Sequence, residues 1–470
     1  MSGEVFSESL SYASMKRRAT SARSFRVRIP SSNSTSFVPE NTIVIDLPAN
    51  LQNQYFNMNQ LYIKMTVTST AAYTLDRCGA LGFIRRLQIS TAGAQICDIN
   101  NYNVLACAMM DTSADPAWMG SFGKTLLGTI GDALTGAQIP IGSTTFCIPL
   151  VLNPLAQTTP HRMIPAFGLS ALQIRLTLDS EANAVKAAGA PGLSFSGVEC
   201  VAYMTELSAA SQALVNGATG GKYNILATSW MQSGATLAAG VNSLTSNLGF
   251  SVSSCERIVM CSRPSGQINS QNFYSLGNRG TAGLQEYSYL IANEQYPARP
   301  ILVGDRGAES LAELMVANHS LVDFSRGGAF ASGYQGVAGR GYGQTQFSGV
   351  DPAAAKADAF MLVGAVGSGS TAGAAAQLLT AAADGDPVTG TATPSNVGTY
   401  QNSVEMESGI SDGKSNVIYS GISTIASTVQ WRGIYGAHAS AFDLDFFCQF
   451  TVLLSLDTSA GGSGVWSVSV

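Results

Sequence analysis

A series of short strand-like segments separated by turns is the feature that most constrains how this chain can fold. The clearest spans residues 61–68, where apolar and polar residues alternate so that Leu61, Ile63, Met65 and Val67 would face a core. Similar segments span residues 42–47, 83–89, 95–99, 145–152, 172–178, 198–207, 223–230, 256–262 and 286–291. Turns that contain Gly or Pro connect them. The pattern predicts an antiparallel sandwich or jelly roll and argues against a parallel sheet of βαβ units.

The same order of elements occurs twice. In the first half, residues 101–111 switch to helical spacing, with Asn101 or Asn103 placed to cap the helix. In the second half, residues 308–324 have helical spacing between strand-like segments. Because 470 residues exceed the size at which one core stops growing, we expect two all-β domains, each with one short helix. A five-residue similarity between residues 176–180 and 454–458 agrees with a repeat, although so short a match can arise by chance.

Three segments of unusual composition predict the domain boundaries. Residues 16–28 hold six basic residues and no acidic one, which predicts a flexible basic arm over residues 1–36. The small and polar residues 208–221 predict a boundary, so the first domain would span 37–215 and the second 222–470. Residues 326–409 are rich in Gly, Ala, Ser and Thr, and we expect a surface insertion on the second domain there.

The arm supplies the candidate interaction site. Its basic residues are Lys16, Arg17, Arg18, Arg23, Arg26 and Arg28. These side chains would contact phosphates, either of nucleic acid or of lipid headgroups. They could equally form a solvated tail, or bind acidic groups on neighbouring subunits, and the sequence leaves these alternatives open.

Charged residues are unusually few. They make up 12% of the chain, whereas about 25% is usual for a soluble domain. A surface with few charges suits burial against neighbouring subunits, because unpaired charges are costly at contacts. The net charge of −5 argues against a protein whose whole surface binds nucleic acid.

Catalytic and metal-binding patterns do not emerge. The three histidines, His161, His319 and His438, are far apart in the sequence, and no G-x-S-x-G segment follows a predicted strand. Gly123, Lys124 and Thr125 match only the end of a phosphate-loop pattern. The sequence therefore predicts that the chain is not an enzyme and needs no cofactor or metal.

The eight cysteines include no C-x-x-C pair, and several lie in apolar runs, which favours free thiols over a disulfide framework. The first fifteen residues have no apolar segment of the kind found in signal peptides, and no run of 18 apolar residues occurs. We expect a protein made in a reducing cytoplasm, without a signal peptide or a membrane span.

The order of these segments resembles that of the double jelly-roll major capsid proteins of DNA viruses, the lineage of adenovirus hexons and polinton-like elements. In the first half the similarity rests on residues 37–39, 84–89, 93, 102–105, 146–150, 164–165 and 172–178. In the second half it rests on residues 286–291, 296–301, 442–447 and 465–468. The order of the segments carries the similarity, since no single segment is specific.

The resemblance implies a fold and a role. Two jelly rolls would stand side by side, and three chains would close into a pseudo-hexagonal capsomer that tiles an icosahedral virion. The partners would be further copies of the chain, first in a homotrimer and then between capsomers. Penton or minor capsid proteins are further candidate partners, as are an internal membrane or the packaged genome through an arm on the inner side.

Two alternatives remain at the level of the sequence. The first is a capsid protein of a small RNA virus, with a single jelly roll and a protruding domain. That protein would have only one jelly roll and a more basic arm. The second is a secreted β-rich adhesin, which would need an export signal.

Overall fold

The computed structural model describes most of the chain. The residues described are 22–48, 51, 53–91, 95–130, 136–156, 158–159, 163–166, 172–303, 308–319, 321, 400–406, 421–436, 438, 440–457 and 465–469. Strands dominate, and the strand pairs among these residues are antiparallel. The predicted all-β fold class is therefore confirmed.

The first half forms a sandwich of two main sheets. The principal strands of one sheet are β1 (Ala22–Pro30), β14 (Ser194–Leu207), β4 (Gln54–Ser69) and β9 (Gly142–Pro149), to which β2 (Ser36–Phe37) and β11 (Ile164–Pro165) add. The other sheet contains β3 (Thr42–Asp46), β12 (Gln173–Leu178), β6 (Ile84–Ser90) and β7 (Gln95–Ile99). A small third sheet contains β5 (Tyr73–Leu75), β8 (Gln138–Ile139) and β13 (Val185–Lys186). The eight principal strands, in chain order, are β1, β3, β4, β6, β7, β9, β12 and β14. Numbered in this way, the strands of one sheet lie in the order first, eighth, third and sixth, and those of the other in the order second, seventh, fourth and fifth.

The second half repeats this strand order. One sheet contains β15 (Lys222–Leu237), β22 (Phe442–Asp457), β17 (Cys255–Pro264) and β20 (Asn402–Glu405), and β10 (Thr158–Thr159) and β23 (Val465–Ser469) add to it. The facing sheet contains β16 (Ser243–Asn247), β21 (Val429–Tyr435), β18 (Leu284–Ile291) and β19 (Glu294–Leu302). Both halves therefore have the double-sheet jelly-roll topology, and the alternative with a single jelly roll is wrong.

The predicted helices occupy equivalent places in the two halves. Helix α1 (Tyr102–Ser113) and helix α6 (Ala308–Ala317) each lie in the connection between the fifth and the sixth strand. After α1 come α2 (Pro116–Trp118), the π-helical turn η4 (Met119–Gly123) and α3 (Lys124–Leu127). Smaller helical turns are η3 (Gly79–Phe83), α4 (Glu181–Ala184) and η6 (Ser265–Gln267). Asn101 precedes α1 but its side chain does not cap the helix, because it donates instead to Asp445 of β22.

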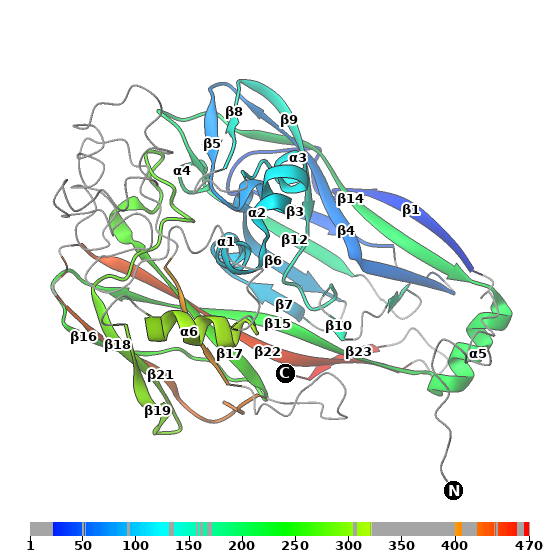
Figure 1. The fold of residues 1–470 in the computed structure, drawn as a ribbon. Coiled ribbons are helices and arrows are strands. Elements are labelled where there is room, and N and C mark those ends of the chain that lie inside the picture. The colour runs from blue at the N-terminus through cyan, green and yellow to red at the C-terminus, as the bar shows by residue number, and fades with distance from the viewer. Residues whose placement is uncertain are drawn as a thin grey trace, which may run out of the picture.

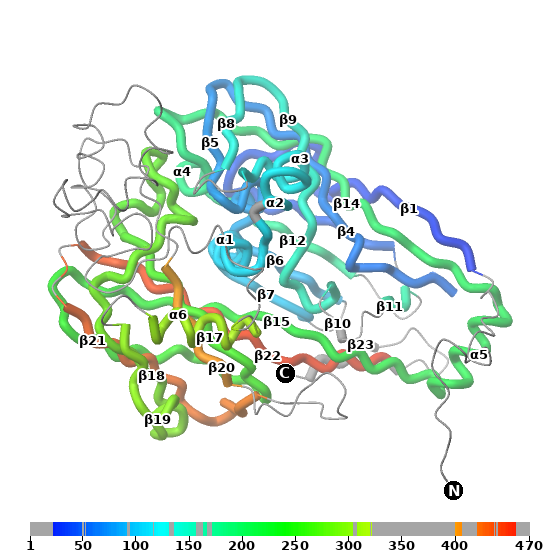
Figure 2. The backbone as a smooth tube through the Cα atoms, in the orientation of Figure 1, coloured from blue at the N-terminus to red at the C-terminus, as the bar shows by residue number. Residues whose placement is uncertain are grey.

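The two jelly rolls lie side by side in one molecule. In Figure 1 the blue and cyan elements of the first half lie above the green, orange and red elements of the second, with α1 between them. Figure 2 shows the chain passing from β14 through helix α5 (Ala209–Thr219) at one end of the molecule and returning along β15. A division of the chain into domains of residues 37–215 and 222–470 stays our proposal.

Helix α5 occupies most of residues 208–221, where the sequence predicted a domain boundary. The side chain of Ser208 accepts a hydrogen bond from the backbone N–H of Ser211, and Gly220 ends the helix in the left-handed conformation. A serine N-cap and a glycine after the last turn are ordinary helix boundary signals.

Strand β1 corrects the predicted extent of the N-terminal arm, residues 1–36. Residues 22–30 pair along their whole length with β14, so the sheet begins well before residue 37. Phe25, Val27 and Ile29 face the core and alternate with Arg26 and Arg28. This alternation is a strand pattern that the cluster of basic residues had obscured.

Two predictions for the second half also need correction. Residues 400–406 fall inside the predicted insertion at 326–409, yet β20 pairs with β17 and Tyr400 is fully buried. Residues 322–399 and 407–420 lie outside the described residues. The short similarity between residues 176–180 and 454–458 does not mark equivalent strands, because β12 is the seventh strand of its half and β22 is the eighth.

Aromatic side chains join the two sheets of the second jelly roll. Trp431 of β21 is fully buried and stacks on Tyr287 with ring centroids 5.1 Å apart. The centroid of the same indole lies 5.2 Å from that of the Tyr289 ring. Across the sandwich, it lies 5.3 Å from the centroid of the Phe446 ring of β22. Trp431 is therefore the centre of this core.

Replacing Trp431 by Ala should lower the free energy of unfolding by about 3–5 kcal/mol, because the cavity removes contacts with three rings. Trp118→Ala is the matched control, since Trp118 is only partly buried and should cost clearly less. Urea unfolding, monitored by circular dichroism, measures the free energy of unfolding of both variants. Equal losses would show that Trp431 has no special role in the core.

Candidate functional site

A buried ion pair network joins the two jelly rolls. Asp111 of α1 accepts from Arg77, whose Nη2 lies 3.0 Å from Asp111 Oδ2, and from Nη2 of Arg279. Arg77 and Asp111 belong to the first half, whereas Arg279 lies between β17 and β18 of the second. Each of the three side chains is at most 1% exposed. Burial lowers the pKa of the Arg279 guanidinium, but Asp111 together with Cys261 and Cys107 raises that pKa above its usual range.

Asp76 completes the network from the first half. Its Oδ2 accepts from the backbone N–H groups of Leu276 at 3.1 Å and Gly277 at 2.8 Å, both in the second half. Arg77 donates in return to the carbonyl of Gly277. Two carboxylates and two guanidinium groups thus balance one another, which is the condition under which buried charges are tolerated.

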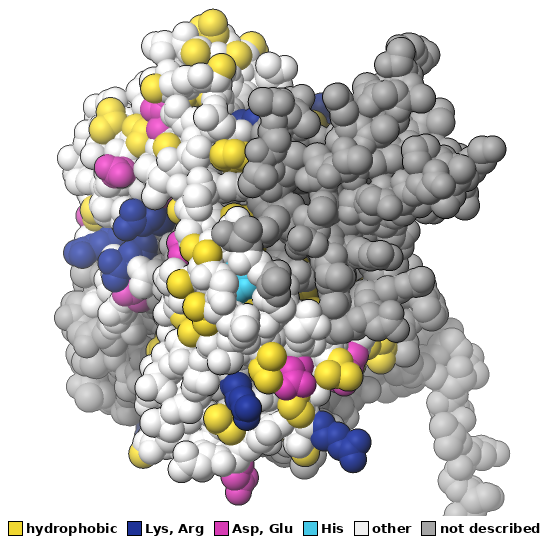
Figure 3. Space-filling model, turned by 90° about the vertical axis from the view of Figure 1, so that its left-hand side faces the viewer, with side chains coloured by type: hydrophobic (Ala, Val, Ile, Leu, Met, Phe, Trp, Pro, Cys, Tyr) yellow, Lys and Arg dark blue, Asp and Glu magenta, His cyan; other side chains and the backbone are white. Residues whose placement is uncertain are grey.

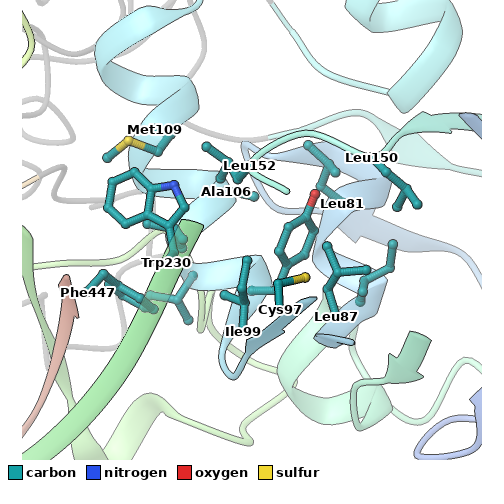
Figure 4. Packing of buried hydrophobic residues seen from close by; sticks show 14 of the residues in the cluster. Leu81, Leu87, Cys97, Ile99, Ala106, Met109, Leu150, Leu152, Trp230 and Phe447 are labelled. Atoms are coloured by element: carbon teal, nitrogen blue, oxygen red, sulfur yellow. The ribbon is translucent and has the colours of Figure 1, made fainter. Parts of the chain in front are cut away.

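Apolar packing also joins the two halves. Figure 4 shows the Trp230 ring of β15 between Met109 of α1 and Phe447 of β22. The Arg257 guanidinium lies 5.2 Å from the centroid of the Trp230 ring and donates to Asn318 Oδ1 at 2.6 Å. Helix α1 is buried over nearly its whole length, so it serves as the common core of both halves.

The predicted interaction residues are only partly placed. Lys16, Arg17 and Arg18 lie outside the described residues, whereas Arg23, Arg26 and Arg28 are exposed on β1. Arg23 pairs with Glu206 of β14 at 3.3 Å. The three arginines therefore belong to a sheet and not to an arm.

Strand pairing adds two charged residues that sequence reasoning missed. Lys64 of β4 is opposite Glu199 of β14 in the register, and Glu199 Oε2 lies 3.7 Å from Lys64 Nζ and 3.8 Å from Arg28 Nη1. Arg28, Lys64 and Glu199 come from three different strands, so no linear pattern could have identified the group. We call Arg26, Arg28 and Lys64 the basic face of this sheet.

Charged side chains are sparse elsewhere on the surface. Figure 3 shows one face on which Lys, Arg, Asp and Glu occupy few positions among the described residues, with apolar side chains scattered between them. The exposed large apolar residues are Val38, Phe122, Leu126, Ile141, Val151, Met163, Leu214, Leu302, Leu321 and Ile425. On this face, the described surface is therefore also poor in charged residues.

His438 and most of the cysteines are buried in the structure, whereas His319 is exposed. Both ring nitrogens of His438 lie near backbone carbonyls, at 3.1 Å from Gly436 and 3.0 Å from Ala238, and His161 lies outside the described residues. All eight cysteines are free thiols, and only Cys147 is more than slightly exposed. Within the described ranges, no group of three or more His, Cys, Asp or Glu side chains could hold a metal ion.

The segment that resembled a phosphate loop, Gly123 to Thr125, runs from η4 into α3 and follows no strand. It therefore lacks the strand, loop and helix order that a phosphate loop requires. Among the helices described here, none is long and apolar enough to cross a membrane.

Comparison with solved structures identifies the fold. The chain is similar to a subunit of the PBCV-1 virus capsid, with 9% identity, a TM-score of 0.56 and coverage of 96% of this chain and 98% of that one. It is similar to the Faustovirus major capsid protein, with 8% identity, a TM-score of 0.55 and coverage of 93% and 90%. The mavirus major capsid protein gives 11% identity, a TM-score of 0.51 and coverage of 95% and 90%. No family model and no curated protein sequence matches the chain.

These similarities extend over nearly the whole chain. At such low identity they establish the fold, which is the double jelly roll that the sequence predicted. The fold is thus similar although few residues are identical, because strand order and burial pattern define it.

We call the buried network of Asp76, Arg77, Asp111 and Arg279 the seam between the jelly rolls. Its importance for stability can be tested by comparing two aspartate substitutions. Asp111→Asn should lower the free energy of unfolding by about 3–5 kcal/mol, because it removes the carboxylate that contacts both buried guanidinium groups, those of Arg77 and Arg279. Asp98→Asn is the control, since the Asp98–Arg86 pair is partly exposed and should contribute below about 1 kcal/mol. Urea unfolding of both variants tests this, and similar losses would contradict the proposed importance of the seam.

Proposed function

We propose that this chain is a major capsid protein, three copies of which form a pseudo-hexagonal capsomer that tiles an icosahedral virus shell. The observation that carries the proposal is the repeated jelly roll, with identical strand order in two sandwiches of one chain. Three such chains around a threefold axis would present six similar sandwiches, which gives a nearly hexagonal outline. The solved structures similar to this chain are those of virus capsids and major capsid proteins.

The seam supports the same role. A capsomer of this kind needs the two sandwiches of each chain at a fixed angle, since neighbouring capsomers must meet in register. The buried pairs of Asp111 with Arg77 and Arg279 resist separation of the halves, because separation would leave charges uncompensated.

The sparsely charged surface supports self-association. Contacts between copies bury large areas, and a surface with few charges loses little hydration energy when it is covered. Weak contacts between capsomers add up over a shell. The proposed role needs no catalytic residue, cofactor or metal, so we propose that the chain is not an enzyme.

We further propose that the protein is made in the host cytoplasm and resides in the virion. Its first partner would be itself, and penton or minor capsid proteins would be further partners. The basic residues, including those at positions 16–18, would contact phosphates of the genome or of lipid headgroups on the inner side. A secreted adhesin remains the alternative and would not need to form trimers.

Native mass spectrometry tests the proposal directly. We expect a species of about 146 kDa, three times the chain mass of 48.8 kDa. Because the proposed contacts are largely uncharged, the trimer should persist in about 1 M salt during size-exclusion chromatography. A persistent monomer or a simple dimer would overturn the capsomer proposal.

A charge-matched comparison tests the three predicted interaction residues that lie on β1. The triple variant Arg23→Gln, Arg26→Gln, Arg28→Gln should weaken binding of the purified protein to an oligonucleotide or to anionic vesicles, and should reduce the salt dependence of that binding. The control carries the same charge change at Arg175, Arg299 and Arg432, which are exposed on other strands. Equal effects in both variants would mean that β1 has no particular role.

A further inference from the structure

Two cysteine thiols meet inside the second jelly roll. Cys255 of β17 and Cys448 of β22 have their Sγ atoms 3.2 Å apart, and neither residue is exposed. The Sδ atom of Met406 lies 3.5 Å from Cys255 Sγ on another side. The three sulfur atoms form a small cluster between neighbouring strands.

A β-bulge brings the two thiols together. In the register Cys255 is opposite Phe450 and Cys448 is opposite Ile258, so both cysteines point to the same face of the sheet. Between these pairs, β17 advances by three residues while β22 advances by two, because the register shifts between Cys255 and Arg257. The extra residue bends β17 and lets diagonal neighbours on one face approach one another.

We propose that Cys255 and Cys448 are a latent disulfide site, which closes when the protein meets a peroxide oxidant. The two sulfur atoms are already within about 1.2 Å of the S–S bonding distance of about 2.0 Å, and both residues lie on adjacent paired strands with their side chains on the same face. The inference does not depend on the proposed capsid role.

The chemistry balances with hydrogen peroxide as the oxidant. One cysteine, as its thiolate, attacks a peroxide oxygen, which forms a sulfenic acid and releases hydroxide. The neighbouring thiol then attacks that sulfur, which forms the S–S bond and expels the oxygen as water after protonation. In total, two thiols and one peroxide give one disulfide and two waters.

The environment makes the reaction slow near neutral pH. Burial, together with the neighbouring Cys255 thiol, raises the pKa of Cys448 well above its usual range. The thiolate is the reactive form, so oxidation should accelerate as the pH rises. A small oxidant suits the site, because the surrounding side chains leave these sulfur atoms buried.

The disulfide would stabilise the second jelly roll against unfolding. It would link β17 to β22 and enclose strands β18 to β21 in one covalent loop. A long closed loop restricts the unfolded chain, so the oxidised protein should unfold at a higher temperature, by about 5 °C. The reduced protein would remain folded through its core packing.

Peptide mapping of the full chain tests the proposal. The protein is incubated with hydrogen peroxide at about pH 8.5, unfolded, treated with N-ethylmaleimide to block free thiols, and digested for mass spectrometry. We expect a linked pair of peptides that contain Cys255 and Cys448, which dithiothreitol separates. Cys97 and Cys200 should carry N-ethylmaleimide, since each is buried and has no cysteine neighbour in its described contacts.

Two controls make the outcome decisive. Met163 is 43% exposed, and its conversion to the sulfoxide shows that the oxidant acted. Cys448→Ala should abolish the linked peptides and the upward shift in melting temperature. If Cys255 and Cys448 are both alkylated while Met163 is oxidised, or if either thiol pairs with another cysteine, the proposal is overturned. The unmodified chain decides this even if the variant fails to fold.

Discussion

The double jelly roll depends on a group of buried charges where its two halves meet. Asp111 and Arg77 come from the first half and Arg279 from the second, and none of the three is accessible to water. Each charge is tolerable only because the others neutralise it. If the halves separated, Arg279 would lose its carboxylate and Asp76 would lose two backbone donors. The halves therefore behave as one body, although each has a complete jelly-roll topology.

This junction also explains an unusual strand pattern. In β22, Phe446, Cys448 and Phe450 face the second core, while Phe447 faces Trp230 and α1 on the other side. Both faces of that sheet are covered, so the strand is apolar in consecutive positions and does not alternate. A sheet that faced water on one side could not have this sequence.

The surface, like the core, carries few charged residues where Figure 3 shows it. Charged residues form local groups such as Arg28, Lys64 and Glu199, and the described surface between them is largely uncharged. A rigid body with such a surface is suited to association with copies of itself, which is the basis of the capsid role that we propose. Identity to the similar capsid structures is near 10%, so the shared property is the arrangement of strands.

The sequence by itself determined the local elements and their repetition. Alternation at residues 61–68 specified β4 and its buried face, because burial on one side of a sheet imposes a period of two residues. Helical spacing at residues 101–111 predicted α1, although the helix is buried on nearly all sides. Alternation in β1 was equally present but was obscured by its arginines, and the small residues 208–221 predicted only a boundary although they hold helix α5.

Tertiary structure alone decided which distant residues meet. The partners of Asp111 lie 34 and 168 positions away along the chain, and Lys64 reaches Glu199 only through strand register. Cys255 and Cys448 are 193 positions apart and meet because of one bulge. Such contacts follow from how sheets pack and pair, and a local sequence pattern carries no information about them.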